Sequence, residues 1–90
     1  MAKLSAHGTI IARVRKEYPL RQSVIDATVV RHTKVLMSDG VILEKHSFYR
    51  PDGSHNVGGW KKLGPVAAAY ANAVAWLALQ SKMGFEQESI

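Results

Sequence analysis

The chain has 90 residues, a net charge of +5 and no cysteine, and it is 47% hydrophobic and 21% charged. This length fits one small domain with a modest core, and this composition excludes a disordered chain. The absence of cysteine excludes disulfides, thiolate metal sites and cysteine nucleophiles. The charge is uneven, because residues 1–62 carry +6 and residues 63–90 carry −1. A basic segment of this kind favours contact with nucleic acid or with an acidic protein surface.

The first predicted element is a strand. Residues 1–7 form a short polar lead that we expect to be frayed. From Thr9 to Tyr18 the pattern then alternates, with Ile10, Ala12 and Val14 on one face and Arg13 and Arg15 on the other. This period of two predicts a half-buried strand, which Pro19 ends.

A β-hairpin is predicted next. Residues 25–37 are rich in β-branched side chains, Ser38-Asp39-Gly40 is a strong turn signal, and residues 41–49 return as the partner strand. Two registers are open. A two-residue turn pairs Ser38 with Val41, whereas a three-residue loop with Gly40 in the left-handed position pairs Met37 with Val41.

We favour the register with the three-residue loop, because it places Lys34 opposite Glu44. Cross-strand pairs of opposite charge, like apolar pairs, each stabilise a hairpin by about 0.2–1 kcal/mol. The same register sets His32 opposite His46. It also forms two apolar pairs, Val35 with Leu43 and Val30 with Phe48.

A fourth, weaker strand is predicted over residues 54–63. Arg50-Pro51-Asp52-Gly53 has the residue order of a type I turn, so the chain reverses there. Gly58-Gly59 weakens the strand that follows and favours a bulge or a close backbone approach.

A long helix is predicted over residues 65–83, which contain seven alanines and no charge before Lys82. Pro65 suits the first helical position and Gly84 suits the residue just past the end. The helix is apolar nearly all round, which predicts burial on more than one side. We therefore expect a homodimer through the helix. The expected interface residues are Tyr70, Ala73, Trp76, Leu77 and Met83.

The order β-β-β-β-α predicts an α+β fold. An antiparallel meander of three to four strands spans residues 8–63, and one long C-terminal α-helix packs on the sheet. Residues 85–90 are expected to be a tail, and 1–90 a single domain. The other sheet face is then available to solvent or to a partner. We expect a cytoplasmic protein, because the N-terminus has no secretory signal and the alanine-rich helix is a poor membrane span.

The histidines give the best candidate for a chemical site, the cross-strand pair His32 and His46. A third metal ligand would have to be Glu44 or water. We expect these histidines to be polar residues on an exposed sheet face, and we predict no metal site and no cofactor. Ser47 beside His46 is no catalytic pair, since neighbours on a strand point to opposite faces. We therefore predict no catalytic residues and a protein that is not an enzyme.

Basic and aromatic residues on the predicted strands favour nucleic-acid binding, DNA first, through the sheet face. Basic residues also commonly line exposed strand edges, where lysine hinders unwanted pairing. The candidate nucleic-acid-binding residues are Arg13, Arg15, Arg31, Lys34, Lys45, Arg50, Trp60, Lys61 and Lys62. The alternative is a small protein-binding module or inhibitor of the phage or plasmid type, acting on a host or defence protein.

The predicted sheet and helix over residues 26–83 resemble, in architecture, the plant Apetala-type and phage-integrase arm-type DNA-binding domains. The run Ala-Ala-Ala-Tyr-Ala over residues 67–71 is similar to the helix of the plant family, whereas the Trp and Arg spacing of its strands is absent. The resemblance implies a sheet that enters the DNA major groove and a helix that supports it from behind.

Overall fold

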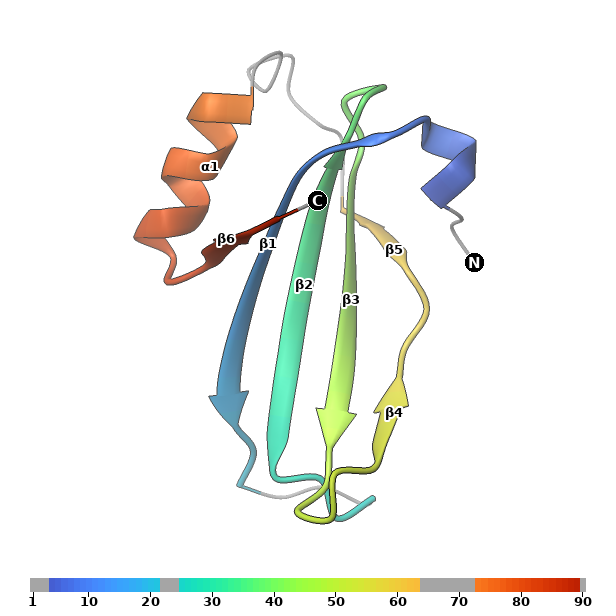
Figure 1. Ribbon diagram of the computed structural model, residues 1–90, viewed down its shortest axis with the longest axis vertical. Coiled ribbons are helices and arrows are strands. Elements are labelled where there is room, and N and C mark those ends of the chain that lie inside the picture. The colour runs from blue at the N-terminus through green and yellow to red at the C-terminus, as the bar shows by residue number, and fades with distance from the viewer. Residues whose placement is uncertain (1–3, 22–24, 64–72, 90) are drawn as a thin grey trace.

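The computed structural model describes residues 4–21, 25–63 and 73–89, and the predicted α+β fold is confirmed (Figure 1). The chain forms a 3₁₀ helix, six strands and one α-helix in the described residues. Their bounds are η1 (Leu4–His7), β1 (Ile10–Pro19), β2 (Val29–Met37), β3 (Ile42–Tyr49), β4 (His55–Val57), β5 (Lys61–Leu63), α1 (Ala73–Lys82) and β6 (Glu86–Glu88).

All the strands belong to one antiparallel sheet in the order β4-β3-β2-β1-β6, and β5 also pairs with β3. The three-residue hairpin loop is confirmed. The Met37 N–H donates to the Val41 carbonyl at 2.8 Å, and the Gly40 N–H donates to the Met37 carbonyl at 2.9 Å. Gly40 has a φ of 88°, a conformation that glycine adopts without the clash a Cβ would make.

The predicted register between β2 and β3 is confirmed along its whole length. Lys34 pairs with Glu44 and His32 pairs with His46. Strand β2 begins at Val29, later than the predicted start at residue 25.

The predicted fourth strand, residues 54–63, is divided at the glycines into β4 and β5, and the predicted close backbone approach is confirmed there. The Gly58 N–H donates to the His46 carbonyl at 2.9 Å, and a Cβ at Gly58 would lie 3.3 Å from that oxygen. This close approach favours glycine. The preceding turn is also confirmed, since the Gly53 N–H donates to the Arg50 carbonyl at 3.0 Å.

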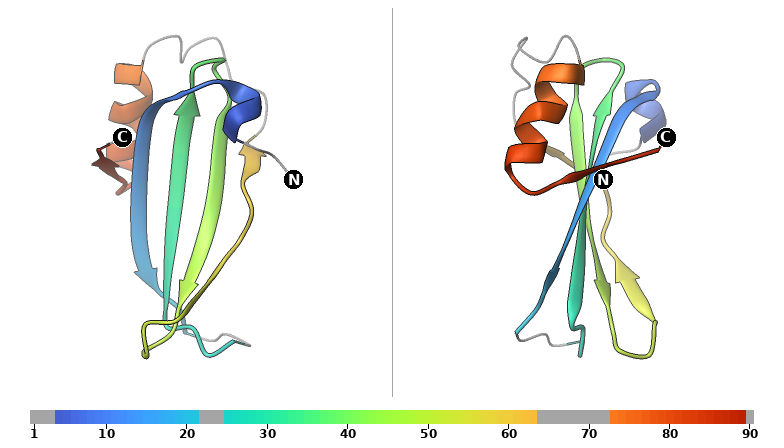
Figure 2. Two further views of the ribbon diagram at one scale, coloured as in Figure 1. Left: turned by 45° about the vertical axis from the view of Figure 1, so that its right-hand side comes forward. Right: turned by 60° about the vertical axis from the view of Figure 1, so that its left-hand side comes forward.

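Core residues lie on both faces of the sheet. On the helix face, the face covered by α1, strands β1–β3 contribute Ala12, Val14, Leu36 and Ile42, which pack with Trp76 and Phe85. On the opposite face, called here the groove face, the buried residues are Val35, Met37 and Leu43. Leu4 of η1 and Trp60 pack against this second cluster. Helix α1 and η1 therefore lie on opposite sides of the sheet (Figure 2).

The C-terminal end of α1 confirms the predicted role of Gly84. The Gly84 N–H donates to the Ser81 carbonyl at 3.1 Å, and the Phe85 N–H donates to the Gln80 carbonyl at 3.0 Å. With a φ of 87° at Gly84, this is a Schellman motif. The predicted first part of the helix, residues 65–72, lies outside the described residues.

The expectation of a tail after Gly84 is wrong for residues 86–88, which form β6. This strand pairs with β1, so that Arg13 lies opposite Glu88 and Arg15 opposite Glu86. Phe85 is buried under the helix and holds the start of the strand in place. The sequence Glu-Gln-Glu has little strand propensity. The strand is stabilised instead by the two cross-strand pairs of opposite charge that it forms with Arg13 and Arg15.

The expected fraying of residues 1–7 is also corrected for Leu4–His7, which form η1. The His7 Nδ1 lies 2.7 Å from an oxygen of the Asp39 carboxylate in the hairpin loop. The Ser38 hydroxyl accepts a hydrogen bond from the Thr9 N–H at 2.9 Å. These contacts between distant residues fix the segment.

One side of α1 is buried within the chain, through Trp76 and Gln80. Val74, Leu79 and, just past the helix, Met83 are exposed. Within the described part of the helix, residues 73–82, the chain itself therefore buries one side only. No helix in the described ranges is long and apolar enough to cross a membrane.

Candidate nucleic-acid interface

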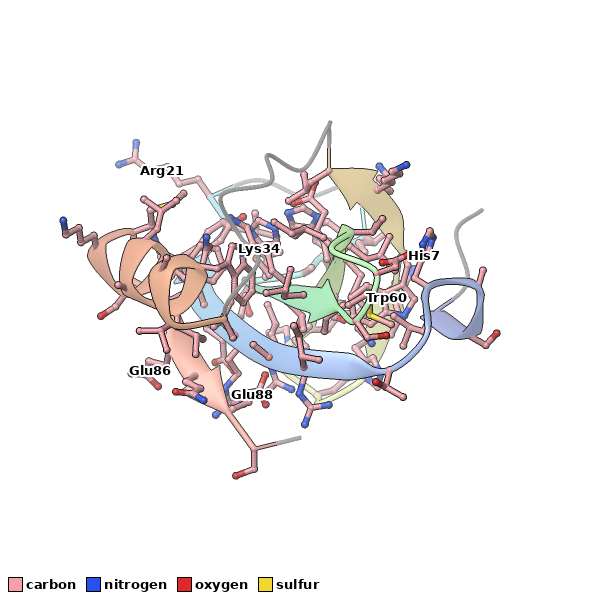
Figure 3. The ribbon with its side chains drawn as sticks, turned by 90° about the horizontal axis from the view of Figure 1, so that it is seen from above. His7, Arg21, Lys34, Trp60, Glu86 and Glu88 are labelled. Atoms are coloured by element: carbon pink, nitrogen blue, oxygen red, sulfur yellow. The ribbon has the colours of Figure 1, made fainter. Side chains whose placement is uncertain are left out.

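Three of the basic side chains on the groove face line one groove, because residues of one parity point the same way along β1, β2 and β3. They are Arg13, Arg31 and Lys45, and they line a groove of about 440 Å³. Leu4 of η1 and Trp60 lie toward one end of the groove and Tyr49 and His55 toward the other. Figure 3 shows Trp60 on the η1 side of the sheet, away from Lys34, which lies toward α1. The structure thus brings the predicted residues Arg13, Arg31, Lys45 and Trp60 to one surface.

Two cations in the groove lie over aromatic rings. The Lys45 Nζ is 4.8 Å from the centroid of the Trp60 ring, and the Arg31 Cζ is 5.0 Å from that of Tyr49. Tyr49 in turn stacks on His55 with centroids 4.9 Å apart. The groove therefore combines positive charge with flat apolar surfaces, the two features that backbone contact and base stacking need.

The arginines of this face have acidic or carbonyl partners. The Arg31 Nε donates to the Glu17 carboxylate at 2.9 Å, and Arg15 lies 3.9 Å from the same carboxylate and 4.0 Å from that of Glu88. Arg13 donates to the carbonyl of Ser89. These ion pairs are partly exposed and contribute about 0–1 kcal/mol each. Within the described residues Lys45 has no acidic partner, so it is more available to a ligand than Arg15 and Arg31.

Lys34 is misplaced in the predicted set, because its parity puts it on the helix face. It is buried, with its Nζ 3.1 Å from the Gln80 Oε1 and 4.4 Å from the centroid of the Phe85 ring. Desolvation lowers the pKa of Lys34, and the nearby Glu44 carboxylate opposes that shift. A buried amine of this kind holds α1 to the sheet and offers no surface to a nucleic acid.

Arg50 serves the turn between β3 and β4. Its guanidinium donates to the Ile25 carbonyl at 2.7 Å, to the Ser54 hydroxyl at 3.2 Å and to the Asn56 side-chain oxygen at 2.6 Å. These three bonds tie together segments that meet at the lower end of the sheet in Figure 1. We therefore interpret Arg50 as a structural residue.

Lys61 and Lys62 are exposed on β5 and point to opposite faces. Lys62 pairs with Leu43, whose side chain lies on the groove face, and Lys61 pairs with Glu44 of the helix face. Only Lys62 can therefore extend the positive charge of the groove.

The predicted dimer residues separate in the structure. Trp76 is buried in the core, and Ala73 and Leu77 pack partly buried against the same cluster. Met83 is exposed, and Tyr70 lies outside the described residues. The stripe that contains Trp76 thus faces the sheet of its own chain.

A second polar cluster lies on the helix face. The Nε2 of His32 is 2.6 Å from the Glu44 carboxylate, and the His32 ring stacks on that of His46 with centroids 4.1 Å apart. Phe85 contacts the His32 ring edge-on at 5.2 Å. Desolvation lowers the pKa of His32, although the hydrogen bond to Glu44 acts in the opposite direction. The expectation of an exposed histidine face is wrong for His32, whose side chain is only 16% exposed and contacts the Phe85 ring.

The candidate nucleic-acid-binding residues omitted two residues of the groove, Tyr49 and His55. The alternation of β3 carries the signal for Tyr49, since Lys45, Ser47 and Tyr49 share a face at a period of two. His55 carries no such signal, because its place opposite Tyr49 depends on the turn geometry.

Comparison with protein-family models, curated proteins and solved structures finds no match to this chain. The structure itself defines the class, a small α+β domain in which an antiparallel meander carries one helix on one face and a basic, aromatic groove on the other.

Proposed function

We propose that the protein binds nucleic acid, in unpaired form, through the groove face. The observation that carries the proposal is the pair of cation–aromatic contacts in one groove, Lys45 with Trp60 and Arg31 with Tyr49. Unpaired bases stack on aromatic side chains, and neighbouring cations contact the phosphates. Both kinds of group lie here within the reach of a short strand.

The shape of the groove favours an unpaired strand over a duplex. A sheet that reads the major groove inserts between the two DNA backbones, so its residues must project from the protein. Here Leu4 and Trp60 pack on the sheet and form a wall at one end of the groove. The basic side chains line the groove beside this wall and do not project from the protein. A single strand can enter such a hollow and present bases and phosphates alternately.

The test is the salt dependence of binding to a fluorescent single-stranded oligonucleotide, measured by anisotropy, with DNA and RNA of the same sequence. The logarithm of the binding constant should fall linearly with the logarithm of salt concentration, because phosphate contacts release counterions. Lys45→Gln should weaken binding and reduce that slope by about 0.7, the value for one contact to a single strand.

Lys82→Gln is the matched control, because it removes the same charge from an exposed position on α1. It should leave the slope unchanged. Trp60→Leu should cost about 1–3 kcal/mol of binding, the range for loss of one stacked base. Its folding is checked separately by circular dichroism, since Trp60 also packs on the core. Absence of binding at low salt, or equal effects of Lys45→Gln and Lys82→Gln, refutes the proposal.

A protein partner is the second candidate function, and exposed apolar side chains on α1 favour it. Val74, Leu79 and Met83 are 75%, 41% and 47% exposed. Val74 and Leu79 lie at opposite edges of the side of α1 that faces away from the sheet, since residues five apart on a helix differ by about 140°. A partner that covers this side would bury both residues, and a second copy of the chain is the simplest occupant. Sedimentation at high protein concentration tests the dimer. A monomer there refutes it, whereas a dimer that Leu79→Ser dissociates supports it.

A further inference from the structure

The cluster of His32, Glu44 and His46 has the composition of a metal site. Two adjacent strands supply the three side chains to one face, His32 from β2 and the other two from β3. One nitrogen or oxygen from each side chain lies within 4.8 Å of the others. Two imidazoles with one carboxylate are a common ligand set for divalent zinc and iron. This cluster lies on the helix face and is independent of the nucleic-acid groove.

The spacing of the donor atoms is close to that of a coordinated ion. Tetrahedral ligands about 2.0–2.2 Å from zinc lie roughly 3.3–3.5 Å from each other. The present donor atoms lie within 4.8 Å of one another, so side-chain rotations alone can bring them to that spacing. The strands need no change, because the His32–His46 pair is already in register.

The surroundings suit neutral imidazole ligands. The side chains of His32 and Glu44 are 16% and 19% exposed, and Phe85 covers the edge of the His32 ring. An apolar cover excludes water and strengthens metal–ligand contacts. The bond between His32 Nε2 and the Glu44 carboxylate is a proton-mediated contact that a metal ion replaces.

Lys34 is the feature that opposes a cation here. It lies opposite Glu44 in the hairpin register and directs its amine toward Gln80 and the Phe85 ring. Its positive charge repels a divalent ion and so lowers the affinity of the cluster for it. The single negative charge of Glu44 does not balance the charges of the lysine and the ion together. Removal of the lysine charge should therefore tighten binding, an effect specific to this site.

We propose that His32, Glu44 and His46 bind one divalent ion of the zinc class, with a coordination position left for water or another small ligand. Three protein ligands satisfy a tetrahedral ion only in part, so that a fourth position remains. The two imidazole rings, now stacked at an interplanar angle of 20°, must tilt so that both lone pairs point at the ion. Loss of this stacking is a signature of binding at these residues.

The test uses Co²⁺ as a probe, followed by displacement with Zn²⁺. The visible absorption of Co²⁺ should intensify on entry into a four-coordinate site, with a stoichiometry of one ion per chain. The ring signals of His32 and His46 in the NMR spectrum should shift together as the stacking is lost. Zinc should raise the unfolding temperature in a dose-dependent way, because it binds only the folded site.

Four variants decide between this site and nonspecific binding. His46→Ala should weaken binding by more than the roughly 10–100-fold that loss of an outer-shell partner costs. Glu44→Gln should also weaken metal binding. This variant conserves the shape of the side chain, so it tests the site even if His46→Ala does not fold. Lys34→Met should tighten metal binding. His55→Ala, which removes an exposed histidine from the other face, should leave it unchanged. An unchanged Co²⁺ spectrum, or equal effects of His55→Ala and Glu44→Gln, overturns the proposal.

Discussion

The amine of Lys34 and the side-chain amide of Gln80 meet at 3.1 Å between the sheet and the C-terminal half of α1, and both residues are buried. Lys34 comes from the middle of the sheet, so this hydrogen bond joins the helix to the meander. A buried amine that loses its acceptor costs about 1–3 kcal/mol. The pair thus makes the docking of α1 sensitive to single substitutions.

Gln80→Leu should lower the free energy of unfolding by about 1–3 kcal/mol at neutral pH, because the charged amine of Lys34 then lacks its acceptor. The double variant Lys34→Met with Gln80→Leu should recover most of that loss, since an apolar pair leaves nothing unsatisfied. Denaturant unfolding measures both. A double variant that is less stable than Gln80→Leu alone would show that the pair is not the cause.

The same pair predicts a rise in stability at alkaline pH. The pKa of Lys34 is lowered in the folded protein from its ordinary value of 10.5, mainly by desolvation. The folded state therefore binds fewer protons than the unfolded state between the lowered pKa and 10.5. The contribution of Lys34 to the free energy of unfolding should increase with pH over that window. The Lys34→Met variant should lack this increase.

Trp76→Ala should destabilise the fold by about 3–5 kcal/mol, because the side chain is 1% exposed and fills the space between α1 and the sheet. Leu79→Ala on the same helix is the control, since Leu79 is 41% exposed, and its effect should stay within about 0.5–1 kcal/mol. Thermal unfolding compares the two. Equal losses would show that the described side of α1 is not the buried one.

Gly84→Ala should cost about 1–2 kcal/mol, because the φ of 87° is unfavourable for a residue with a Cβ. Space is not the obstacle, as the added carbon would lie 3.4 Å from the flexible end of the Lys16 side chain. Gly84→Asn should cost less, since asparagine tolerates the left-handed conformation. If alanine and asparagine destabilise the protein equally, backbone conformation is not the reason.

The Asp39 carboxylate predicts a dependence of stability on acid pH. It accepts a hydrogen bond from the Val41 N–H at 2.9 Å, and this bond is the main cause that lowers the pKa of Asp39 below 3.8. The stability that Asp39 contributes is present above pH 3.8 and is lost as the pH falls through the lowered pKa. Asp39→Asn should therefore flatten the acid limb of an unfolding curve.

Asp52 gives an independent comparison at the other end of the sheet. Hydrogen bonds from the Ser54 hydroxyl and N–H lower the pKa of Asp52, so Asp52→Asn should have an effect of the same sign. The two turns lie at opposite ends of the hairpin strands (Figure 1), and distant sites add. Strong non-additivity in the double variant would contradict this account.

Local patterns predicted much of the fold because its turns and strands depend on neighbouring residues. Gly40 and the pairing of Lys34 with Glu44 determined the hairpin register, and Gly84 marked the helix end. The pairing of β6 with β1 was not predictable in this way. It depends on Phe85, which is buried only once the helix has returned the chain to the sheet.

The candidate site was predicted only in part. The groove does contain basic and aromatic residues, as predicted. Which of the candidate residues share its face depends on the position of each residue along its strand, and the candidate set mixed residues of both faces. Lys34 shares a strand with Arg31 yet points to the opposite side of the sheet. Arg50 forms hydrogen bonds to residues brought near by a turn. Composition and charge carry no information about either placement.

The central claim is that the groove face binds unpaired nucleic acid, and an NMR titration with a single-stranded oligonucleotide tests it most directly. Backbone amide signals of Thr33, Lys45, Ser47 and Tyr49 should shift on binding, because these residues line the groove. Signals of residues 74–82 on α1 should stay in place. Shifts confined to α1, or no shifts at low salt, would contradict the claim.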